Sequence, residues 1–268
     1  MGRPRLLTVA GVDPAGAAGV AADLKTFQQF GCYGMCVVSA LTVQDTCAVH
    51  AVRPLDAAFV HAQIEALVGD CPPRATKTGM LANAEIAAVV RDAAARGALG
   101  PLVVDPVLRA TGGEALAADE LVVALRGLVA HAAVVTPNAD ELERLAEERV
   151  TDEAGAVRAA RRLLRTGVGA VLAKGGHRGD AASAVVDLLV EADGSVLRLE
   201  RPRIAIERTH GTGCALSAAL ACGLARGLDV RAASRAAGDF VHRGLAAAFP
   251  VGRGGVPIDH GVSTEDLR

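Results

Sequence analysis

An α/β fold with a mostly parallel sheet flanked by helices is the architecture that this sequence predicts. Short apolar runs rich in Val, Leu and Ala alternate with longer segments whose apolar residues recur at helical spacing. This alternation is typical of a parallel sheet that is covered by helices on both faces. Hydrophobic residues make up 51% of the 268 and aromatic residues only 2%, so Ala, Val and Leu must fill a core of considerable size.

Each expected strand is a short run of apolar or β-branched residues. These runs cover residues 6–10, 35–41, 74–78, 101–105, 132–136 and 169–175. The helices expected between them cover residues 21–31, 57–70, 83–97 and 118–131. Two further runs, 184–190 and 195–200, are joined across Asp193 and Gly194 and predict a hairpin on the far side of the sheet. No linker, repeat or low-complexity stretch interrupts the sequence, so residues 1–268 are predicted to form a single domain.

Charge and cysteine content exclude several classes of protein. The net charge of -2 favours neither a nucleic-acid nor a membrane partner. The six cysteines form no CxxC pair, and the histidines supply no zinc spacing, which indicates reduced thiols in a cytoplasmic protein. Asp13 ends the first apolar run too early for a signal peptide. The uncharged stretch 26–44 contains glutamines and glycines, so a helix, a loop and a strand fit it better than a membrane span.

Polar and glycine residues follow the expected strands at the points where these end. They are Gly11 to Asp13, Gly79 and Met80, Asp105 and Pro106, Thr136 to Asn138, and Lys174 to His177. In open α/β sheets, ligands bind outside the carboxyl ends of the strands. The sequence therefore predicts a binding site at this edge of the sheet.

The stretch Gly211-Thr212-Gly213-Cys214 leads directly into an Ala- and Leu-rich helix. A glycine-rich turn of this kind exposes unpaired N–H groups at the positive end of a helix, where an anion binds well. The same field is expected to lower the pKa of the Cys214 thiol toward neutrality. The alternative is a tight turn followed by a core cysteine, and the residues alone favour neither interpretation.

Other polar positions also allow an ordinary structural interpretation. Asp23 and Lys25 would ordinarily be surface charges on a helix. Asn138 and Glu141 fit a helix cap with an acidic first turn, or ligands around a hydrated magnesium ion on a nucleotide. Lys174 with the glycines after it fits a simple turn, or a cation beside phosphates.

The combination of motifs is more specific than any one of them. In chain order they are GVDPAGAAGVAADLKT (11–26), ALTVQDT (40–46), TKTGML (76–81), LVVDPV (102–107), ATGGEAL (110–116), VTPNADE (135–141), LAKGGH (172–177), THGTGCALSAA (209–219) and PIDH (257–260). Together they resemble the hydroxymethylpyrimidine/phosphomethylpyrimidine kinases of thiamine biosynthesis, within the ribokinase-like superfamily. The resemblance covers almost the whole chain, and THGTGC and KGGH are its most diagnostic parts.

This resemblance implies a ribokinase-like three-layer sandwich, usually in a homodimer. It implies transfer of a phosphoryl group from ATP to 4-amino-5-hydroxymethyl-2-methylpyrimidine, and then to its monophosphate to give the pyrophosphate. Mg²⁺ would act with ATP, and a monovalent cation is a further candidate cofactor. The expected partners are therefore small-molecule substrates and a second copy of the chain.

The resemblance also implies roles for single residues. Those implied in catalysis are Gly211, Thr212 and Gly213, which form an anion hole, and Cys214, the base in place of the aspartate of sugar-kinase relatives. The residues implied in binding are Asp105, Asn138 and Glu141 for magnesium, Lys174, Gly176 and Thr209 for ATP, and Gly11, Asp23, Gln44, Met80 and Val107 for the pyrimidine. The amide of Gln44 offers a donor and an acceptor, which suits an aminopyrimidine edge.

Five positions depart from the family pattern. Val12, Ala15, Ala17 and Ala21 replace the usual serines, glycine and glutamine of the first motif, and Arg208 stands where asparagine is usual. These departures keep the phosphoryl-transfer residues and leave the identity of the acceptor open.

Three other functions compete with the pyrimidine kinase. A pyridoxal/pyridoxine kinase is the nearest, because its substrate is also a hydroxymethyl-bearing heteroaromatic ring. A cysteine hydrolase would use Cys214 as nucleophile and His210 as base, but it leaves Lys174, Asn138 and Glu141 unexplained. A catalytically silent binding protein conflicts with the intact Cys214 and its glycine-rich loop.

Overall fold

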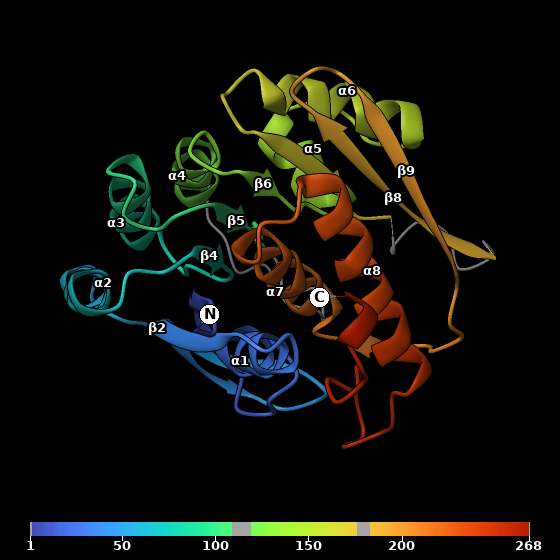
Figure 1. The fold of residues 1–268 in the computed structure, drawn as a ribbon, viewed down its shortest axis with the longest axis horizontal. Helices are drawn as coiled ribbons and strands as arrows, with labels where there is room; N and C mark the ends of the chain where they lie inside the picture. Colours follow the sequence, from blue (N-terminus) through green and yellow to red (C-terminus); the bar gives the residue numbers. More distant parts are fainter. Residues whose placement is uncertain (1, 109–118, 176–182, 268) are drawn as a thin grey trace.

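A nine-stranded sheet forms the centre of the molecule (Figure 1). The computed structural model describes residues 2–108, 119–175 and 183–267. The strands of this sheet are β1 (Arg5–Val12), β2 (Tyr33–Gln44), β3 (Val49–Pro54), β4 (Ala75–Thr78), β5 (Leu102–Val104), β6 (Val134–Val135), β7 (Ala170–Ala173), β8 (Ala184–Glu191) and β9 (Val196–Pro202). Two short strands, β10 (Thr209–His210) and β11 (Val256–Pro257), pair separately in parallel.

The strand order of the sheet is β3-β2-β1-β4-β5-β6-β7-β8-β9. From β2 to β7 all neighbours are parallel, whereas β3 and the β8–β9 hairpin pair antiparallel at the two edges. The mostly parallel sheet, the six expected strands and the hairpin are thus confirmed. Strand β3 was not predicted, because two of its six residues are half-buried, four are exposed and none is buried.

Helices cover both faces of the sheet, which gives the expected three layers (Figure 1). They are α1 (Gly19–Gln29), α2 (Ala57–Asp70), α3 (Ala84–Ala95), α4 (Asp119–Val129), α5 (Ala139–Ala146), α6 (Glu153–Leu164), α7 (Thr212–Ala225) and α8 (Val230–Ala246), with a final 3-10 turn, η1 (Glu265–Leu267). Side chains of α2 to α6 share one core cluster with the sheet, and those of α1, α7 and α8 share the other.

Helix α7 lies deepest in the molecule because its side chains are small. Ten of its fourteen residues are buried, and they are mainly Ala, Leu, Ser, Cys and Gly. Small side chains allow α7 to pack closely against α1, α8 and strands β1, β4 and β5. A Cβ on Gly213, in its first turn, would be 3.2 Å from Nζ of Lys174 and 3.7 Å from Oδ2 of Asp105, so the N-terminus of α7 lies at the carboxyl ends of β5 and β7.

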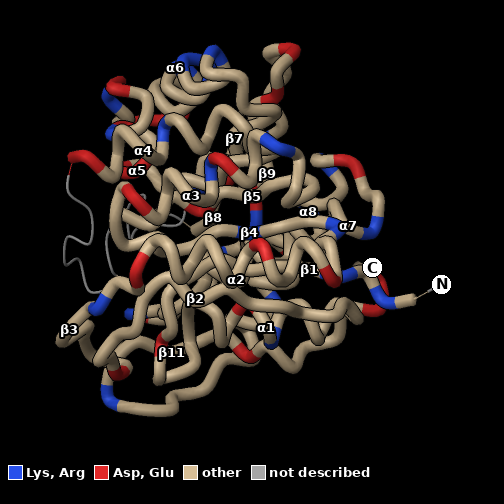
Figure 2. Tube along the Cα trace, turned by 90° about the vertical axis from the view of Figure 1, so that its left-hand side faces the viewer, with Lys and Arg blue, Asp and Glu red and all other residues tan. Residues whose placement is uncertain are grey.

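Basic and acidic residues are interspersed along the chain trace on the face shown in Figure 2. In the described ranges, none of the helices combines the length and the apolar character needed to cross a bilayer.

Candidate active site

The carboxyl ends of the parallel strands bring the chemically active side chains of the predicted edge together. Lys174, after β7, places its Nζ 2.8 Å from Oδ1 of Asp105, after β5, and 3.7 Å from Oε2 of Glu141 in α5. Asp105 is almost fully buried, and Ser217 of α7 donates to its Oδ2 at 3.3 Å. The ends of β5 and β7 and the starts of α5 and α7 thus meet at a cluster of one ammonium and two carboxylates, which we call the Lys174 cluster.

Glu141 has two tasks in this cluster. It closes a capping box at the start of α5, in which Asn138 N donates to Glu141 Oε2 at 2.8 Å and Glu141 N donates to Asn138 Oδ1 at 2.9 Å. Burial raises the pKa of the Glu141 carboxyl to about 6, against the opposing pull of Lys174. Glu141 is therefore both a structural cap and a carboxylate that is sensitive to pH near neutrality.

The glycine-rich loop before α7 has a conformation that only glycine suits. Gly211 has φ +78°, and a Cβ on it would lie 1.7 Å from the carbonyl oxygen of Ala17. The loop is therefore pressed against the N-terminal turn, residues 13–18. Neither α7 nor α1 has a side-chain N-cap, whereas α2, α3, α5, α6 and α8 each have one. In the described residues, the uncapped starts of α1 and α7 lie beside each other at the site, where their N–H groups can bind an anion.

Asp13 holds the N-terminal turn in shape. Its carboxylate accepts hydrogen bonds from the backbone N–H of Ala15, Ala17 and Ala18, at 2.8 to 3.1 Å, and His210 Nε2 lies 3.1 Å from its Oδ2. Burial raises the pKa of this carboxyl, but the hydrogen bonds from His210 and the backbone outweigh that effect and hold it below its ordinary value. The sequence placed Asp13 at the predicted binding edge, but it gave no sign that this carboxylate holds the turn.

Cys214 lies half-buried in the first turn of α7. Burial raises the pKa of its thiol to about 11, while the Lys77 ammonium and the Gly19 N–H lower it, and Asp23 and Asp105 raise it further. The expected fall toward neutrality was therefore wrong. The helix field that motivated it is a local effect, and the desolvation of the thiol by the surrounding helices and strands outweighs it.

Lys77 and Asp23 form a fully buried ion pair beneath the site. Lys77 Nζ lies 2.9 and 2.8 Å from the two carboxylate oxygens of Asp23, and Thr8 Oγ1 donates to Asp23 at 2.6 Å. The expectation of a surface charge was wrong for Asp23, because α1 turns this residue toward the sheet. It was right for Lys25, which is exposed and donates to the carbonyl of Gly16.

Replacing Asp23 with alanine is expected to destabilise the protein by about 3–5 kcal/mol, because Lys77 would be left as a buried charge without its partner. Chemical denaturation measures this free energy of unfolding. The matched control is Glu65→Ala, which removes a half-exposed partner of Arg96 and should cost less than about 1 kcal/mol. Equal losses of unfolding free energy in the two variants would show that the buried ion pair stabilises the protein no more than an exposed one.

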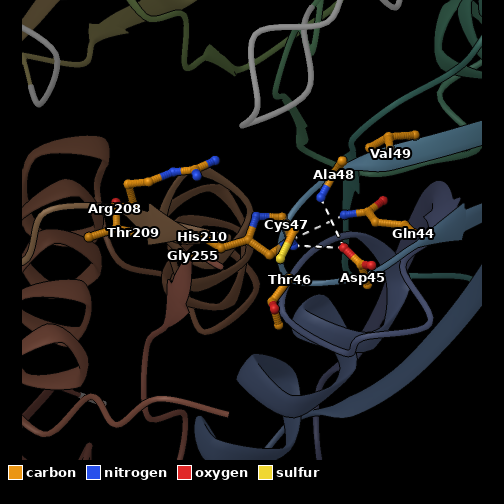
Figure 3. Close-up of a pocket in the computed structure, with 10 residues that line it drawn as sticks. All are labelled: Gln44, Asp45, Thr46, Cys47, Ala48, Val49, Arg208, Thr209, His210 and Gly255. Carbon is orange, nitrogen blue, oxygen red and sulfur yellow. Dashed lines mark hydrogen bonds between the residues drawn. The ribbon is translucent and has the colours of Figure 1, made fainter. Parts of the chain in front are cut away.

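A pocket lies between the β2–β3 loop and the segment before α7 (Figure 3). It is lined by Gln44, Asp45, Thr46, Cys47, Ala48, Val49, Arg208, Thr209, His210 and Gly255. Figure 3 shows the imidazole of His210 and the amide of Gln44 directed toward each other. Thr209, expected among the ATP-binding residues, lines this pocket together with Gln44.

The remaining residues implied for the pyrimidine lie at strand ends. A Cβ on Gly11 would be 2.4 Å from Cε of Met80, so the Met80 side chain packs directly over this glycine. Val107 is half-buried, and its N–H donates to the carbonyl of Asp105 at 2.9 Å. Met80 and Val107 thus follow the neighbouring strands β4 and β5, at the edge of the sheet where the Lys174 cluster lies.

The turn after β7 carries a further glycine that packing requires. A Cβ on Gly175 would lie 1.8 Å from the carbonyl oxygen of Val186, and Gly175 N donates to Asp187 Oδ1 at 2.9 Å. Burial raises the pKa of the Asp187 carboxyl. Asp187 was not predicted as a site residue, because in sequence it is one polar position within the apolar strand β8. Gly176, implied for ATP binding, lies outside the described residues.

The donor set at the Lys174 cluster fits a hard cation that is held largely by other ligands. In the described part of the chain, no three His, Cys, Asp or Glu side chains are grouped so that they could hold a metal by themselves. The carboxylates of Asp105 and Glu141 nevertheless both face Lys174, and oxygen donors of this kind suit Mg²⁺ that keeps its waters and nucleotide oxygens.

Comparison with known proteins agrees with the fold and the motifs. Residues 13–259 match the phosphomethylpyrimidine kinase family. The chain is 44% identical, over 96% of its length and 94% of the relative's, to a hydroxymethylpyrimidine/phosphomethylpyrimidine kinase of Streptomyces coelicolor. A Bacillus subtilis pyridoxal kinase solved as an ADP complex superposes with a TM-score of 0.89 at 30% identity, covering 96% of this chain and 97% of that one.

A second solved structure is the phosphomethylpyrimidine kinase of Clostridium difficile. It superposes with a TM-score of 0.78 at 33% identity, over 90% of this chain and 98% of that one. The family match extends over most of the chain, and the relatives are covered almost from end to end. The chain therefore belongs to the phosphomethylpyrimidine kinase family, a family of phosphotransferases with a ribokinase-like α/β fold.

Proposed function

We propose that this protein transfers the γ-phosphoryl group of ATP to 4-amino-5-hydroxymethyl-2-methylpyrimidine and then to the resulting monophosphate, as a step in thiamine biosynthesis. One observation carries the proposal. The start of α7, which has no side-chain cap, lies beside both the Cys214 thiol and the Lys174 cluster. Anion-binding N–H groups, a cation and a proton acceptor are the groups that phosphoryl transfer to an alcohol needs.

The glycine-rich loop is assigned to the transferring phosphoryl group. N–H groups of Gly211, Thr212 and Gly213 point out of the start of α7, where the helix dipole favours negative charge. A Cβ on Gly213 would be 3.2 Å from Nζ of Lys174, so the ammonium lies directly beside the loop. The loop and Lys174 together would stabilise negative charge on the phosphoryl oxygens in the transition state.

Cys214 is assigned to the proton of the acceptor hydroxyl. A neutral alcohol must lose a proton as it attacks phosphorus, and a positioned base accelerates such a step. The thiolate is the form that accepts this proton, and with a thiol pKa of about 11 it is a minor species at neutral pH. The alcohol step should therefore become faster as the pH rises.

Asp105, Asn138 and Glu141 are assigned to the hydrated magnesium ion. When bound, the ion would neutralise charge on the phosphates and orient them. Glu141 would contact its water shell in the ionised form, and burial places the pKa of this carboxyl at about 6. Magnesium affinity should accordingly fall as the pH falls through that value.

Replacing Glu141 with glutamine is expected to raise the magnesium concentration needed for half-maximal rate by about tenfold or more, because a charged ligand becomes neutral. Glutamine keeps an oxygen for the capping box, whereas alanine would also remove the partner of Asn138 N. The measurement is initial rate against magnesium concentration. The control is Asp140→Asn, which changes the exposed carboxylate next in sequence. An unchanged magnesium dependence would show that Glu141 caps α5 and has no role in magnesium binding.

A pyridoxal kinase is the second candidate, favoured by the close superposition on the Bacillus subtilis pyridoxal kinase. The cysteine hydrolase is less favoured. Its assumed base is His210, and Nε2 of this residue contacts Asp13 and Gln44. The test is ADP release from Mg-ATP with the pyrimidine alcohol, with pyridoxine and without an acceptor. A higher kcat/KM for the pyrimidine supports the proposal, and a higher value for pyridoxine assigns the chain to the second function.

The domain organisation and the assembly of the protein are proposed separately from its reaction. We propose a single domain over residues 1–268, because strands drawn from residues 5 to 202 join one sheet, against which α7 and α8 pack. The homodimer and the monovalent-cation requirement rest on the family resemblance alone. Light scattering and rates measured with K⁺ against Na⁺ test them.

A further inference from the structure

The ion pair of Lys77 and Asp23 is closed to any ligand. Lys77 Nζ lies 2.9 and 2.8 Å from the two carboxylate oxygens of Asp23, and the hydroxyl of Thr8 donates to one of them at 2.6 Å. All three residues are fully buried. The family resemblance implied Asp23 for the pyrimidine, but in this arrangement its carboxylate offers no accessible oxygen to a substrate. Its task therefore has to be sought among its buried neighbours.

The neighbour that carries chemistry is Cys214. The backbone N–H of Gly19, at the start of α1, donates to Cys214, and Asp23 stands one turn later in the same helix. Helix α7, which carries Cys214, packs on both α1 and β4. A Cβ on Gly79 would lie 2.9 Å from Lys77 Nζ, so the ammonium extends to the carboxyl end of β4. The thiol and the ammonium thus belong to one buried junction of α1, α7 and β4.

The charges around Cys214 act on its thiol with unequal strength. Burial raises the pKa of the thiol, Lys77 lowers it, and Asp23 and Asp105 each raise it by less than Lys77 lowers it. Lys174, in its own cluster, also interacts with Cys214. Because Lys77 acts on the thiol more strongly than Asp23 does, the ion pair presents its positive end to Cys214.

We propose that Lys77 is a positioning residue that stabilises the thiolate of Cys214, and that Asp23 holds the Lys77 ammonium in place for this task. An isolated ammonium would lose its charge on burial, whereas a paired one keeps it. The inference rests on the proposed function, in which the proton of the acceptor hydroxyl passes to the sulfur of Cys214. The thiolate becomes a thiol in that step, and Lys77 keeps its own proton throughout.

Two double variants remove both charges of the pair. Lys77→Met with Asp23→Leu makes the contact apolar, a replacement of a buried ion pair that proteins often tolerate. Lys77→Gln with Asp23→Asn keeps a hydrogen bond between the two side chains, so it provides a second route to a folded protein. The control is Thr76→Val, which removes a buried hydrogen bond to the carbonyl of Leu99 at 2.7 Å in the same strand and leaves the pair intact.

The effect on Cys214 can be measured without any substrate. Iodoacetamide alkylates thiolates, and mass spectrometry follows Cys214 and the exposed Cys47 separately from pH 7 to 9. We expect Cys214 to react about threefold or more slowly in both double variants. Its thiolate fraction falls about tenfold for each unit of pKa, and the greater reactivity of a less acidic thiolate recovers part of this loss.

The reference reactions show whether the change is specific. Cys47 should react at the same rate in every variant, and Thr76→Val should leave the rate of Cys214 unchanged. An unchanged or faster reaction of Cys214 in the double variants would overturn the proposal, whatever the enzyme phosphorylates.

Kinetics test whether the stabilised thiolate serves the reaction. In the double variants we expect kcat for the alcohol to fall about threefold or more, with KM for the alcohol and kcat for the monophosphate nearly unchanged. Equal losses of kcat in the two steps would show only structural support and contradict the proposal. A higher KM for the alcohol at unchanged kcat would return Asp23 to the pyrimidine site and contradict it as well. If wild-type protein phosphorylates no pyrimidine, the proposed function fails, while alkylation still decides whether Lys77 stabilises the thiolate.

Discussion

Replacing Cys214 with alanine is expected to slow phosphorylation of the alcohol by up to about 10²–10⁴-fold, the usual contribution of a general base, with the larger losses at higher pH, where more of the thiol is ionised. The second step should be much less affected. Its acceptor is a phosphate monoester with a second pKa of about 6, so its oxygen is already largely ionised at neutral pH. The loop from Gly211 to Gly213 survives in this variant, because backbone N–H groups form it.

The two steps have to be measured separately, with purified alcohol and purified monophosphate, above pH 7. Cys222→Ala is the matched control, because it makes the same change two turns later in α7, where the thiol is buried in the core. We expect both steps to be nearly unchanged in the control. Equal proportional losses in the two steps of Cys214→Ala would show that this residue supports the loop and removes no proton.

The pH profile gives a second measure of the same role. A base acts in its deprotonated form, and burial raises the pKa of the Cys214 thiol to about 11. Below this value the thiolate fraction increases about tenfold with each pH unit, so the alcohol step should accelerate across pH 7 to 9. The monophosphate step should be nearly flat there. A steep profile that persists in Cys214→Ala would assign the proton transfer to another group.

Replacing Gly211 with alanine is expected to damage both steps by about 10²–10³-fold, the loss typical when a transition-state N–H donor is displaced. The new Cβ would lie 1.7 Å from the carbonyl oxygen of Ala17, so the loop or the N-terminal turn must move. The φ of +78° adds strain for any residue with a side chain. Because the anion loop serves both acceptors, this variant should not distinguish them, in contrast to Cys214→Ala.

Gly227→Ala is the control for the strain alone. Gly227 follows α7 with φ +89°, and apart from its chain neighbours no described atom lies within 4 Å of the position of its Cβ. The Gly227→Ala variant should lose some stability but little activity. Thermal unfolding of both variants shows whether a lower rate comes from a less stable protein or from a changed Gly211 loop. If Gly211→Ala kept the rates of both steps, the loop would not be the anion hole.

The architecture was predictable because it depends on patterns that run through the whole sequence. Alternating strands and helices specify a parallel sheet, and a parallel sheet places residues as distant as Asp105 and Lys174 at one edge. Strand β3 could not be predicted, because an edge strand without buried residues has no apolar pattern in the sequence. The cluster of Lys174, Asp105 and Glu141 thus follows from topology, although its distances do not.

Properties of the site that depend on burial could not be predicted in the same way. Lys77 stands in a short polar-looking strand, β4. It becomes a buried partner of Asp23 only because α7 packs on β4 while α1 packs on α7 and the neighbouring strand β1. The pKa of Cys214 depends on how far neighbouring elements exclude water from the thiol. The link between Gln44, His210 and Asp13 joins residues up to 197 positions apart, and local sequence carries no signal for it.

The proposed function is tested most directly by following the products formed from Mg-ATP and 4-amino-5-hydroxymethyl-2-methylpyrimidine over time. Mass spectrometry and ³¹P NMR distinguish the alcohol, its monophosphate and its pyrophosphate. We expect the monophosphate to appear first and then to be converted to the pyrophosphate, with one ADP released for each phosphoryl group transferred. No phosphorylated pyrimidine under conditions in which pyridoxine is converted to its phosphate would contradict this account and assign the site to pyridoxal-type substrates.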